Sequence, residues 1–190
     1  MLNDEQYIHR ILNSGTESAV FALVKKYECQ VFNLCFRVLR DREVAEEVAQ
    51  DIFLKALKEL DKLEDHSKFG GWLMRIAYRK SIDQVRKKKV QFVNLEDEKT
   101  RHLESDISQL ASAGVESEDR IDLLEKELKQ IPEMDSALIS LYYLDGFSVK
   151  EVAEVMGLTE SNVKVRLMRT RELLKRNLTQ KLGNETKDLY

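Results

Sequence analysis

An all-α fold is predicted for this chain by three features of its sequence. Apolar residues recur at intervals of three and four over long stretches, which places them on one face of a helix. The 190 residues include one proline and seven glycines, too few for the turns that a strand-rich fold requires. About a third of the residues are charged, which suits helices with one polar face each. At this length we expect two compact helical domains.

The N-terminal domain is expected over residues 1–89, and it should contain four helices. These helices are predicted over residues 4–12, 17–39, 42–60 and 69–88. Thr16 and Asp41 stand where the N-caps of the second and third helices belong. In the second helix, the stripe that should face the core comprises Val20, Phe21, Val24, Tyr27, Val31, Leu34 and Val38.

The cysteines and histidines predict neither a metal site nor a cofactor. Cys29 and Cys35 lie six positions apart within a helical pattern, a spacing that matches no metal or redox motif. The histidines are scattered along the chain, at His9, His66 and His102. We therefore expect both cysteines to be small core residues.

One face of the third helix is acidic. The residues expected to face inward are Val44, Val48, Ile52 and Leu57. The acids on the opposite side are Glu43, Glu46, Glu47 and Asp51. Such a face is either simply solvated or a docking surface, and the pattern alone leaves both interpretations open.

The fourth helix is basic along one flank. Its apolar stripe comprises Phe69, Trp72, Leu73 and Ile76. Arg75, Arg79 and Arg86 follow one edge of this stripe, and the helix ends in four consecutive cations at residues 86–89. The helix dipole accounts for one or two cations at a C-terminus, so part of this run needs another explanation.

An interdomain linker is predicted over residues 90–116, where no helical period holds. This segment is polar and acidic, and a structureless stretch of that length is unusual inside a compact domain. The C-terminal domain should therefore span residues 117–190. Its first two helices are predicted over residues 117–130 and 133–144, the second ending at Asp145 and Gly146.

A helix-turn-helix is predicted within the C-terminal domain. Ser148 and Glu151 have the spacing of a capping box, which opens a short helix. Gly157 permits the left-handed turn that ends this helix, and Thr159 caps a longer one over residues 160–182. Such a pair of helices places the second one in the major groove of DNA.

The second helix of this motif is cationic on its outer face. Its inward residues are Val163, Leu167, Leu174 and Leu178. Its outer face has one acid, Glu172, and the cations Lys164, Arg166, Arg169, Arg171, Lys175 and Arg176. The net charge of −3 gives no global sign of nucleic-acid binding. This local face is therefore what favours DNA binding over an ordinary helical hairpin.

Two sets of motifs resemble the extracytoplasmic-function group of bacterial sigma factors. Region four of that family is similar to Pro132-Glu133, to Leu141 followed by residues 145–153 (DGFSVKEVA), and to Val163, Lys164, Arg166, Leu167, Arg169 and Arg171. Region two is similar to residues 43–53 (EVAEEVAQDIF) and 69–77 (FGGWLMRIA). The two sets stand in the family's order, with a variable linker between them.

The resemblance implies a protein that is not an enzyme, binds core RNA polymerase and directs it to promoters. By similarity, the acidic helix docks on the clamp helices of the large polymerase subunit. The residues expected there are Glu46, Glu47, Gln50 and Asp51. An anti-sigma factor is an expected partner, and the linker is expected either to enter the RNA exit path or to be a solvated tether.

The fourth helix is implied to bind the promoter minus-ten element, and the loop over residues 63–71 to hold a base that has left the stack. Aromatic rings beside cations suit the capture of single-stranded DNA. The residues expected there are Phe69, Arg75, Tyr78, Arg79, Lys80, Arg86, Lys87 and Lys88. Trp72 is expected to be a core residue. Many relatives carry asparagine in place of Arg79, which puts the family's base preference in doubt here.

The second helix of the helix-turn-helix is implied to bind the minus-thirty-five element. The residues expected at base edges are Lys164, Val165, Met168 and Arg169. The residues expected mostly at phosphates are Ser161, Asn162, Arg166 and Arg171.

Two other classes of protein compete with this interpretation. A dimeric helix-turn-helix regulator would bind a palindrome alone, whereas a sigma factor is expected to be a monomer that needs polymerase. An enzyme finds little support, because the sequence has no phosphate loop, zinc-ligand pair or nucleophile elbow. Residues 1–13 lack the pattern of a signal peptide and no apolar run is long enough to span a membrane, so a cytoplasmic protein without membrane insertion is expected.

Overall fold

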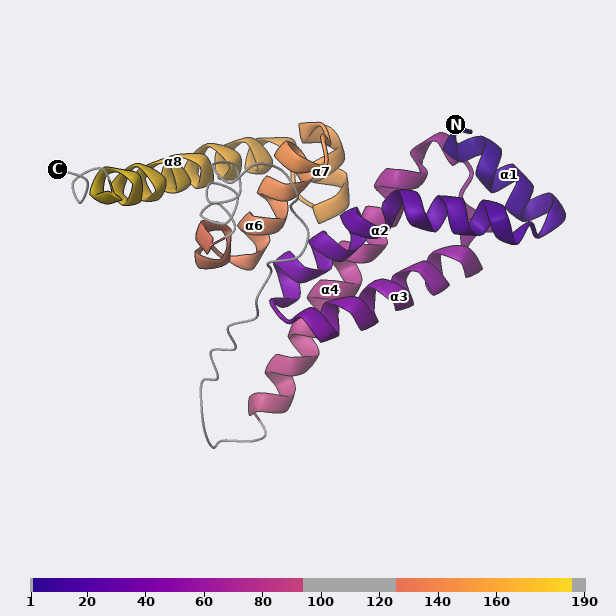
Figure 1. The fold of residues 1–190 in the computed structure, drawn as a ribbon, viewed down its shortest axis with the longest axis horizontal. Helices are drawn as coiled ribbons and strands as arrows, with labels where there is room; N and C mark the ends of the chain where they lie inside the picture. Colours follow the sequence, from indigo (N-terminus) through magenta and orange to yellow (C-terminus); the bar gives the residue numbers. More distant parts are fainter. Residues whose placement is uncertain (1, 94–125, 186–190) are drawn as a thin grey trace.

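The computed structural model describes residues 2–93 and 126–185, and every regular element in these ranges is helical (Figure 1). The N-terminal elements are α1 (Asp4–Ser14), α2 (Glu17–Leu39), α3 (Arg42–Lys58), the short turns η1 (Leu60–Lys62) and η2 (His66–Lys68), and α4 (Phe69–Val93). Residues 126–130 are helical, and the elements after them are α6 (Glu133–Ile139), η3 (Ser140–Leu144), α7 (Val149–Met156) and α8 (Glu160–Glu185). The predicted all-α class is confirmed.

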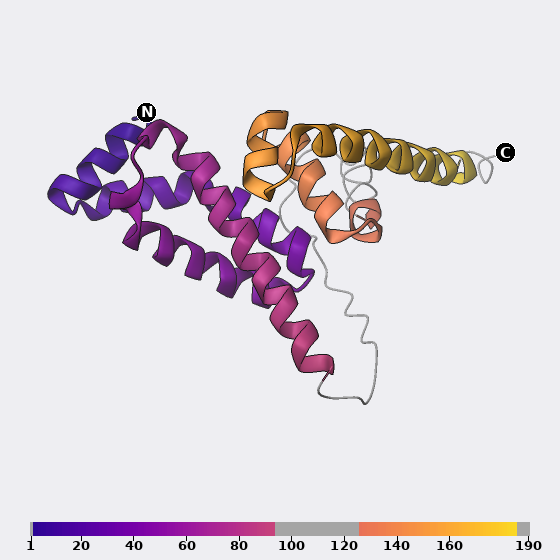
Figure 2. The same ribbon diagram turned by 180° about the vertical axis from the view of Figure 1, so that it is seen from behind.

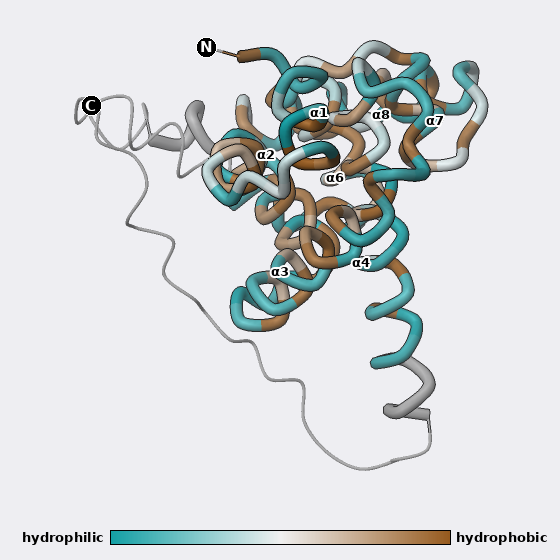
Figure 3. Tube along the Cα trace, turned by 90° about the vertical axis from the view of Figure 1, so that its right-hand side faces the viewer, coloured by the Kyte–Doolittle hydropathy of each residue, from teal (hydrophilic) through white to brown (hydrophobic). Residues whose placement is uncertain are grey.

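The N-terminal domain is organised around α2, which packs against α1, α3 and α4. Apolar side chains from these helices, among them Val31, Leu34, Ile52 and Leu73, are fully buried. The hydrophobic stretches of the chain, brown in Figure 3, gather where the helices meet. Asp41 caps α3, since its carboxylate accepts a hydrogen bond from the Val44 amide. The tight α2–α3 turn that follows from this cap holds the two helices side by side.

Two core predictions on α2 are wrong. Phe21 is 71% exposed, and Cys29 is exposed as well, whereas Cys35 is buried as expected. The buried positions of this helix follow the run Ala19, Leu23, Tyr27 and Val31. Phe21 and Cys29 each lie two positions from members of that run, which is a rotation of about 200° around the helix axis. Their side chains therefore point away from the core.

Several helix ends differ from the prediction. The third helix stops at Lys58 and continues as the 3₁₀ turn η1. The helix predicted over 133–144 is α-helical to Ile139 and then widens into the π-type turn η3, where the Asp145 amide donates to the Ser140 carbonyl. The predicted linker lies largely in residues 94–125, outside the described residues, as does most of the helix predicted over 117–130.

The helix-turn-helix is confirmed in its details. Ser148 and Glu151 form the reciprocal capping box of α7, and Gly157 has a φ of 69° in the turn that follows. The Thr159 hydroxyl accepts a hydrogen bond from the Asn162 amide at the start of α8. These local interactions set where α7 ends and α8 begins, and the two helices pack against each other.

The two domains pack against each other. Helix α2 contacts α6, and α4 contacts α7, so that α7 lies against α4 when the molecule is seen from behind (Figure 2). The buried apolar residues form one cluster that continues from the N-terminal helices into the C-terminal ones. Neither helical periodicity nor composition predicts this packing.

Candidate nucleic-acid and protein interfaces

The outer face of α8 combines cations with exposed apolar side chains. Lys164, Arg169 and Arg171 are exposed, as are Ser161 and Asn162 in the first turn. Val165 is 43% and Met168 is 48% exposed on the same face, between the cations. Cations can hold phosphates, while exposed methyl and thioether groups can contact the methyl group of thymine in the major groove. This face has the chemistry to distinguish base pairs.

Arg166 differs from its neighbours on α8. Its Nε lies 2.9 Å from Oδ1 of Asp135 on α6, and both side chains are largely covered. This ion pair joins the recognition helix to the rest of its own domain. The phosphate contact predicted for Arg166 would therefore have to compete with Asp135.

The acidic face of α3 is open. All four residues predicted for polymerase binding, Glu46, Glu47, Gln50 and Asp51, are exposed. Arg42 pairs with Glu46 at 3.0 Å, and Lys80 of α4 pairs with Asp51 at 2.8 Å. The hydrogen bond and the charge of Lys80 lower the pKa of Asp51. Asp51 is therefore a carboxylate at any physiological pH.

Leu54 is a member of this face that the sequence reasoning missed. It is 58% exposed, and it lies three and four positions after Asp51 and Gln50, on the same side of the helix. The available signal was its place outside the buried run of Ala45, Val48 and Ile52. An exposed leucine beside acids is typical of the apolar centre of a protein interface.

Phe69 does not offer a ring to DNA, contrary to the prediction. It is 2% exposed, and its ring packs edge-on against Tyr27 at 5.4 Å between centroids and lies 5.9 Å from the ring of Trp72. All three residues belong to the N-terminal domain, so this burial does not depend on the packing between domains. Trp72 is half-buried against the same core.

The other predicted residues on α4 divide into covered and open ones. Arg79, Arg86 and Lys87 are exposed. Arg86 lies 3.9 Å from Asp83, and Lys88 pairs with Asp41 at 3.2 Å. Tyr78 is buried, and burial raises its pKa. Arg75 is half-buried, with Nη2 3.8 Å from Oε2 of Glu154 on α7. Of these residues, Arg75 and Tyr78 face the C-terminal domain.

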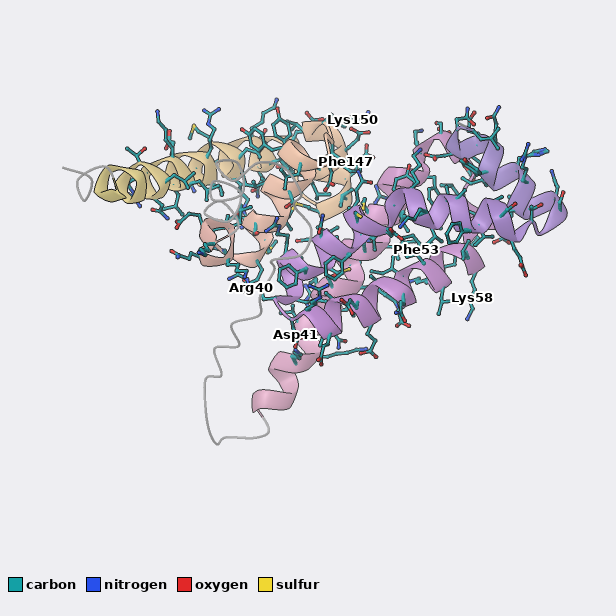
Figure 4. All side chains as sticks on the ribbon, viewed as in Figure 1. Arg40, Asp41, Phe53, Lys58, Phe147 and Lys150 are labelled. Atoms are coloured by element: carbon teal, nitrogen blue, oxygen red, sulfur yellow. The ribbon has the colours of Figure 1, made fainter. Side chains whose placement is uncertain are left out.

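A cleft of about 870 Å³ separates the two domains beside Arg75. One wall is the end of the predicted base-holding loop, with Gly70, Gly71 and Trp72, and the other carries Phe147 and Lys150, labelled in Figure 4. Gly70 packs closely on Tyr27: a Cβ at this position would lie 3.0 Å from the Tyr27 hydroxyl, so a larger residue would have to displace that side chain by a few tenths of an ångström.

Comparison with known proteins agrees with this geometry. The family model for sigma-70 region 2 matches residues 23–90, and that for sigma-70 region 4 matches residues 121–174. The chain is 32% identical to the extracytoplasmic-function sigma factor SigW of Bacillus subtilis over 174 residues, 88% of this chain and 92% of the relative. The chain belongs to the sigma-70 family, in its extracytoplasmic-function group.

Other members of the group show the same relationship. The sigma-E factor of Escherichia coli K12 is 28% identical to this sigma factor over 189 residues, covering 91% of the chain and 93% of the relative. The fold is similar to that of RpoE from Bartonella quintana, solved in complex with the anti-sigma factor NepR, with a TM-score of 0.70, 20% identity and coverage of 83% of this chain and 95% of that one. The fold is also similar to that of CnrH, solved with the cytosolic domain of CnrY. The TM-score is 0.62 and the identity 22%, with coverage of 93% of this chain and 97% of that one.

Within the described residues, the sigma factor shows no group of three His, Cys, Asp or Glu side chains that could hold a metal. Burial raises the pKa of the Cys35 thiol to about 11, so this cysteine is protonated and unreactive. No helix in the described ranges is long and apolar enough to cross a membrane.

Proposed function

We propose that this sigma factor binds core RNA polymerase through α3 and directs it to promoters through α4 and α8. The observation that carries the proposal is that one chain of this family exposes an acidic face with an apolar centre on one domain and a cationic reading face on the other. The two domains are proposed to span residues 1–89 and 117–190, with residues 90–116 as the connection between them.

The polymerase surface comprises Glu46, Glu47, Gln50 and Asp51, to which we add Leu54. The acids steer a basic partner, and the leucine supplies apolar area that becomes dry on docking. Leu54→Ser should therefore weaken core binding, by about tenfold for a central apolar contact. Leu12→Ser is the matched control, because Leu12 is an exposed leucine on α1, outside this face.

The minus-thirty-five surface comprises the exposed side chains of α8. Lys164, Val165, Met168 and Arg169 contact base edges, while Ser161, Asn162 and Arg171 hold phosphates. If Arg169 makes a bidentate contact with guanine, Arg169→Ala costs roughly 1 to 3 kcal/mol on the cognate site and little on scrambled DNA. Arg176→Ala removes an exposed cation farther along the same helix and should weaken binding to both DNAs equally.

The minus-ten surface comprises the cationic side of α4 and the loop before it. Arg75, Tyr78, Arg79, Lys80, Arg86, Lys87 and Lys88 contact the separated strand. We do not assign Phe69 to this surface, because its side chain is buried. Trp72 follows the loop and is half-buried against the core. Because many relatives carry asparagine in place of Arg79, we expect this protein to prefer a different base in the minus-ten element.

We further propose a cytoplasmic, non-enzymatic monomer that is held inactive by an anti-sigma factor. RpoE, which has a similar fold, was solved with the anti-sigma factor NepR, and CnrH was solved with the cytosolic domain of CnrY. The competing function is a dimeric regulator that binds a palindrome without polymerase.

Reconstitution tests the proposal. The purified chain is mixed with bacterial core polymerase and assayed for association and for transcription from the promoter upstream of its own gene. Polymerase binding with promoter-dependent transcripts, weakened by Leu54→Ser but not by Leu12→Ser, is the expected result. Failure to bind core, together with tight dimeric binding to a palindrome, would establish the competing function instead.

A further inference from the structure

The promoter-facing flank of α4 is occupied by another part of the same chain. Helix α7 lies along this flank, and Val155 and Met156 of α7 are buried beside Tyr78. Val155 lines both the large cleft and a second crevice that separates α7 from α4. A strand of DNA could not reach Tyr78 while α7 is in this place.

The charges of α7 complement those of α4. The carboxylate of Glu154 lies 3.8 Å from the Arg75 guanidinium, and it adds, after the larger effect of Asp65, to the raised pKa of Lys68. Lys68 and Arg75 both line the cleft beside the base-holding loop. Glu154 thus places a negative charge between two cations that are suited to a phosphate.

Two arginines at the end of α2 hold the C-terminal domain in this position. Arg40 donates from its two terminal nitrogens to the backbone carbonyls of Lys129 and Ile131, just before α6 (Figure 4). Its Nε also lies 3.7 Å from the carboxylate of Glu133. Arg37 is buried and donates from Nε to the Ser140 hydroxyl at 3.1 Å. These contacts join residues about ninety to a hundred positions apart.

The backbone at Arg40 has a conformation that glycine adopts more easily than arginine. Arg40 ends α2 with a φ of 54°, the only positive φ of a non-glycine residue in the described ranges. Glycine is the residue that ordinarily ends a helix in this conformation. Arginine at this position adopts a less favourable backbone conformation than glycine would. Its planar guanidinium group hydrogen-bonds to the neighbouring domain.

In the closed arrangement, one of the buried polar atoms without a hydrogen-bond partner belongs to the flank of α4. The Nε of Arg75 is buried and has no hydrogen-bond partner. A buried donor without an acceptor opposes closure, and a phosphate could satisfy it. Replacing the contacts of α7 with contacts to DNA would therefore satisfy a donor that the closed form leaves without an acceptor.

We propose that α7 and the promoter strand compete for the same flank of α4, with Glu154 in the place of a phosphate and Arg40 holding the closed form. This inference rests on the proposed function of α4. The acidic face of α3 and the outer face of α8 remain exposed in the closed form. Polymerase can therefore bind the closed chain first, and separation of the domains then frees the minus-ten surface.

Two variants of the full chain test the competition. Arg40→Gly removes the grip while giving the helix end its preferred residue, so the N-terminal domain keeps its fold. Its control is Arg42→Ala, which removes an exposed cation whose ion pair, with Glu46, and ring contact, with Phe32, both lie within the N-terminal domain. Glu154→Gln removes the charge, and its control is Glu160→Gln at the exposed start of α8.

Domain separation is measured by energy transfer between dyes on Cys29, which is exposed, and on a cysteine introduced by Glu172→Cys. Binding is measured with a short oligodeoxythymidine, in the absence of polymerase. Arg40→Gly should lower energy transfer, and both Arg40→Gly and Glu154→Gln should raise affinity for the oligonucleotide by about fivefold. The two controls should change neither quantity, and Arg75→Ala combined with Glu154→Gln should lose the gain.

Three results would overturn the inference. Unchanged energy transfer in Arg40→Gly would show that this residue does not hold the domains together. Lower energy transfer in Arg40→Gly with unchanged affinity for the oligonucleotide would show that α7 does not block the flank. Equal affinity of Glu154→Gln and wild type would show that Glu154 does not occupy the place of a phosphate. Transcription with core polymerase separates these failures from failure of the proposed function, because in the latter case even the wild type directs no transcripts.

Discussion

Replacing Asp145 with asparagine should stabilise the protein at neutral pH. Asp145 is half-buried at the end of η3, and burial raises its pKa to about 6, against the lowering effect of Arg37. In the unfolded chain the pKa of an aspartate is about 3.9. The folded state therefore binds more protons between these values, and the free energy of unfolding falls as the pH rises from about 4 to 6. The loss is complete about one pH unit above the folded pKa.

The size of the effect follows from the shift. Two pK units correspond to about 3 kcal/mol for a group fully removed from solvent. Asp145 is only partly buried, so solvent screening reduces this to about 1 kcal/mol. Asparagine has the same shape, is neutral at every pH and suits the turn before Gly146. The stabilisation by Asp145→Asn should thus be near zero at pH 4 and about 1 kcal/mol at pH 7.

The assay is urea denaturation followed by circular dichroism at several pH values between 4 and 7.5. Asp61→Asn is the control, because Asp61 is exposed in η1. The difference between Asp145→Asn and wild type should grow through the window, while that of the control stays flat. A difference that is constant with pH, or that changes sign so that asparagine destabilises at pH 7, would refute the assigned cause.

Three further predictions follow from burial and exposure. Phe69→Ala should lower the free energy of unfolding by about 3 to 5 kcal/mol in denaturant titrations, whereas a residue that only stacked on DNA would cost almost nothing. On the minus-thirty-five element, uracil in place of thymine should weaken binding by about 0.8 kcal/mol per lost methyl contact, in gel-shift titrations, and variants with alanine at Val165 and Met168 should be insensitive to the replacement. A thiol reagent should label Cys29 in the native protein and reach Cys35 only on unfolding, as mass spectrometry of the labelled peptides will show.

The helix-turn-helix was predictable because its determinants are local. Ser148 and Glu151 are three residues apart, and Gly157 needs only its own backbone angles to end α7. Interactions of this range are encoded in adjacent letters of the sequence, so the caps, the turn and the start of α8 all agree with the prediction. The exposed acids on α3 were predictable for the same reason, since one helical period separates them from the buried run.

The burial of Phe69 and Tyr78 was not predictable from period or composition. Phe69 is covered by Tyr27, more than forty positions earlier, and Tyr78 is covered by α7, more than seventy positions later. An aromatic residue at the edge of an apolar stripe has the same local sequence whether its ring packs inward or stacks on a base. Only the three-dimensional arrangement of other elements decides between the two.

The two proposed promoter surfaces differ in how many of their cations are already paired with carboxylates. On α4, the cations Arg75, Lys80, Arg86 and Lys88 each lie within 4 Å of a carboxylate, whereas Arg79 and Lys87 have no ion pair among the described residues. A phosphate that binds one of the paired cations replaces an existing partner, and exchanging one exposed ion pair for another gains little free energy. On α8, Lys164, Arg169 and Arg171 have no ion pair in the described part of the chain, so each releases counterions on binding DNA and gains the full electrostatic benefit. We therefore expect α8 to bind duplex DNA, and we expect binding to α4 to become favourable mainly when a strand is separated and its bases contribute stacking as well.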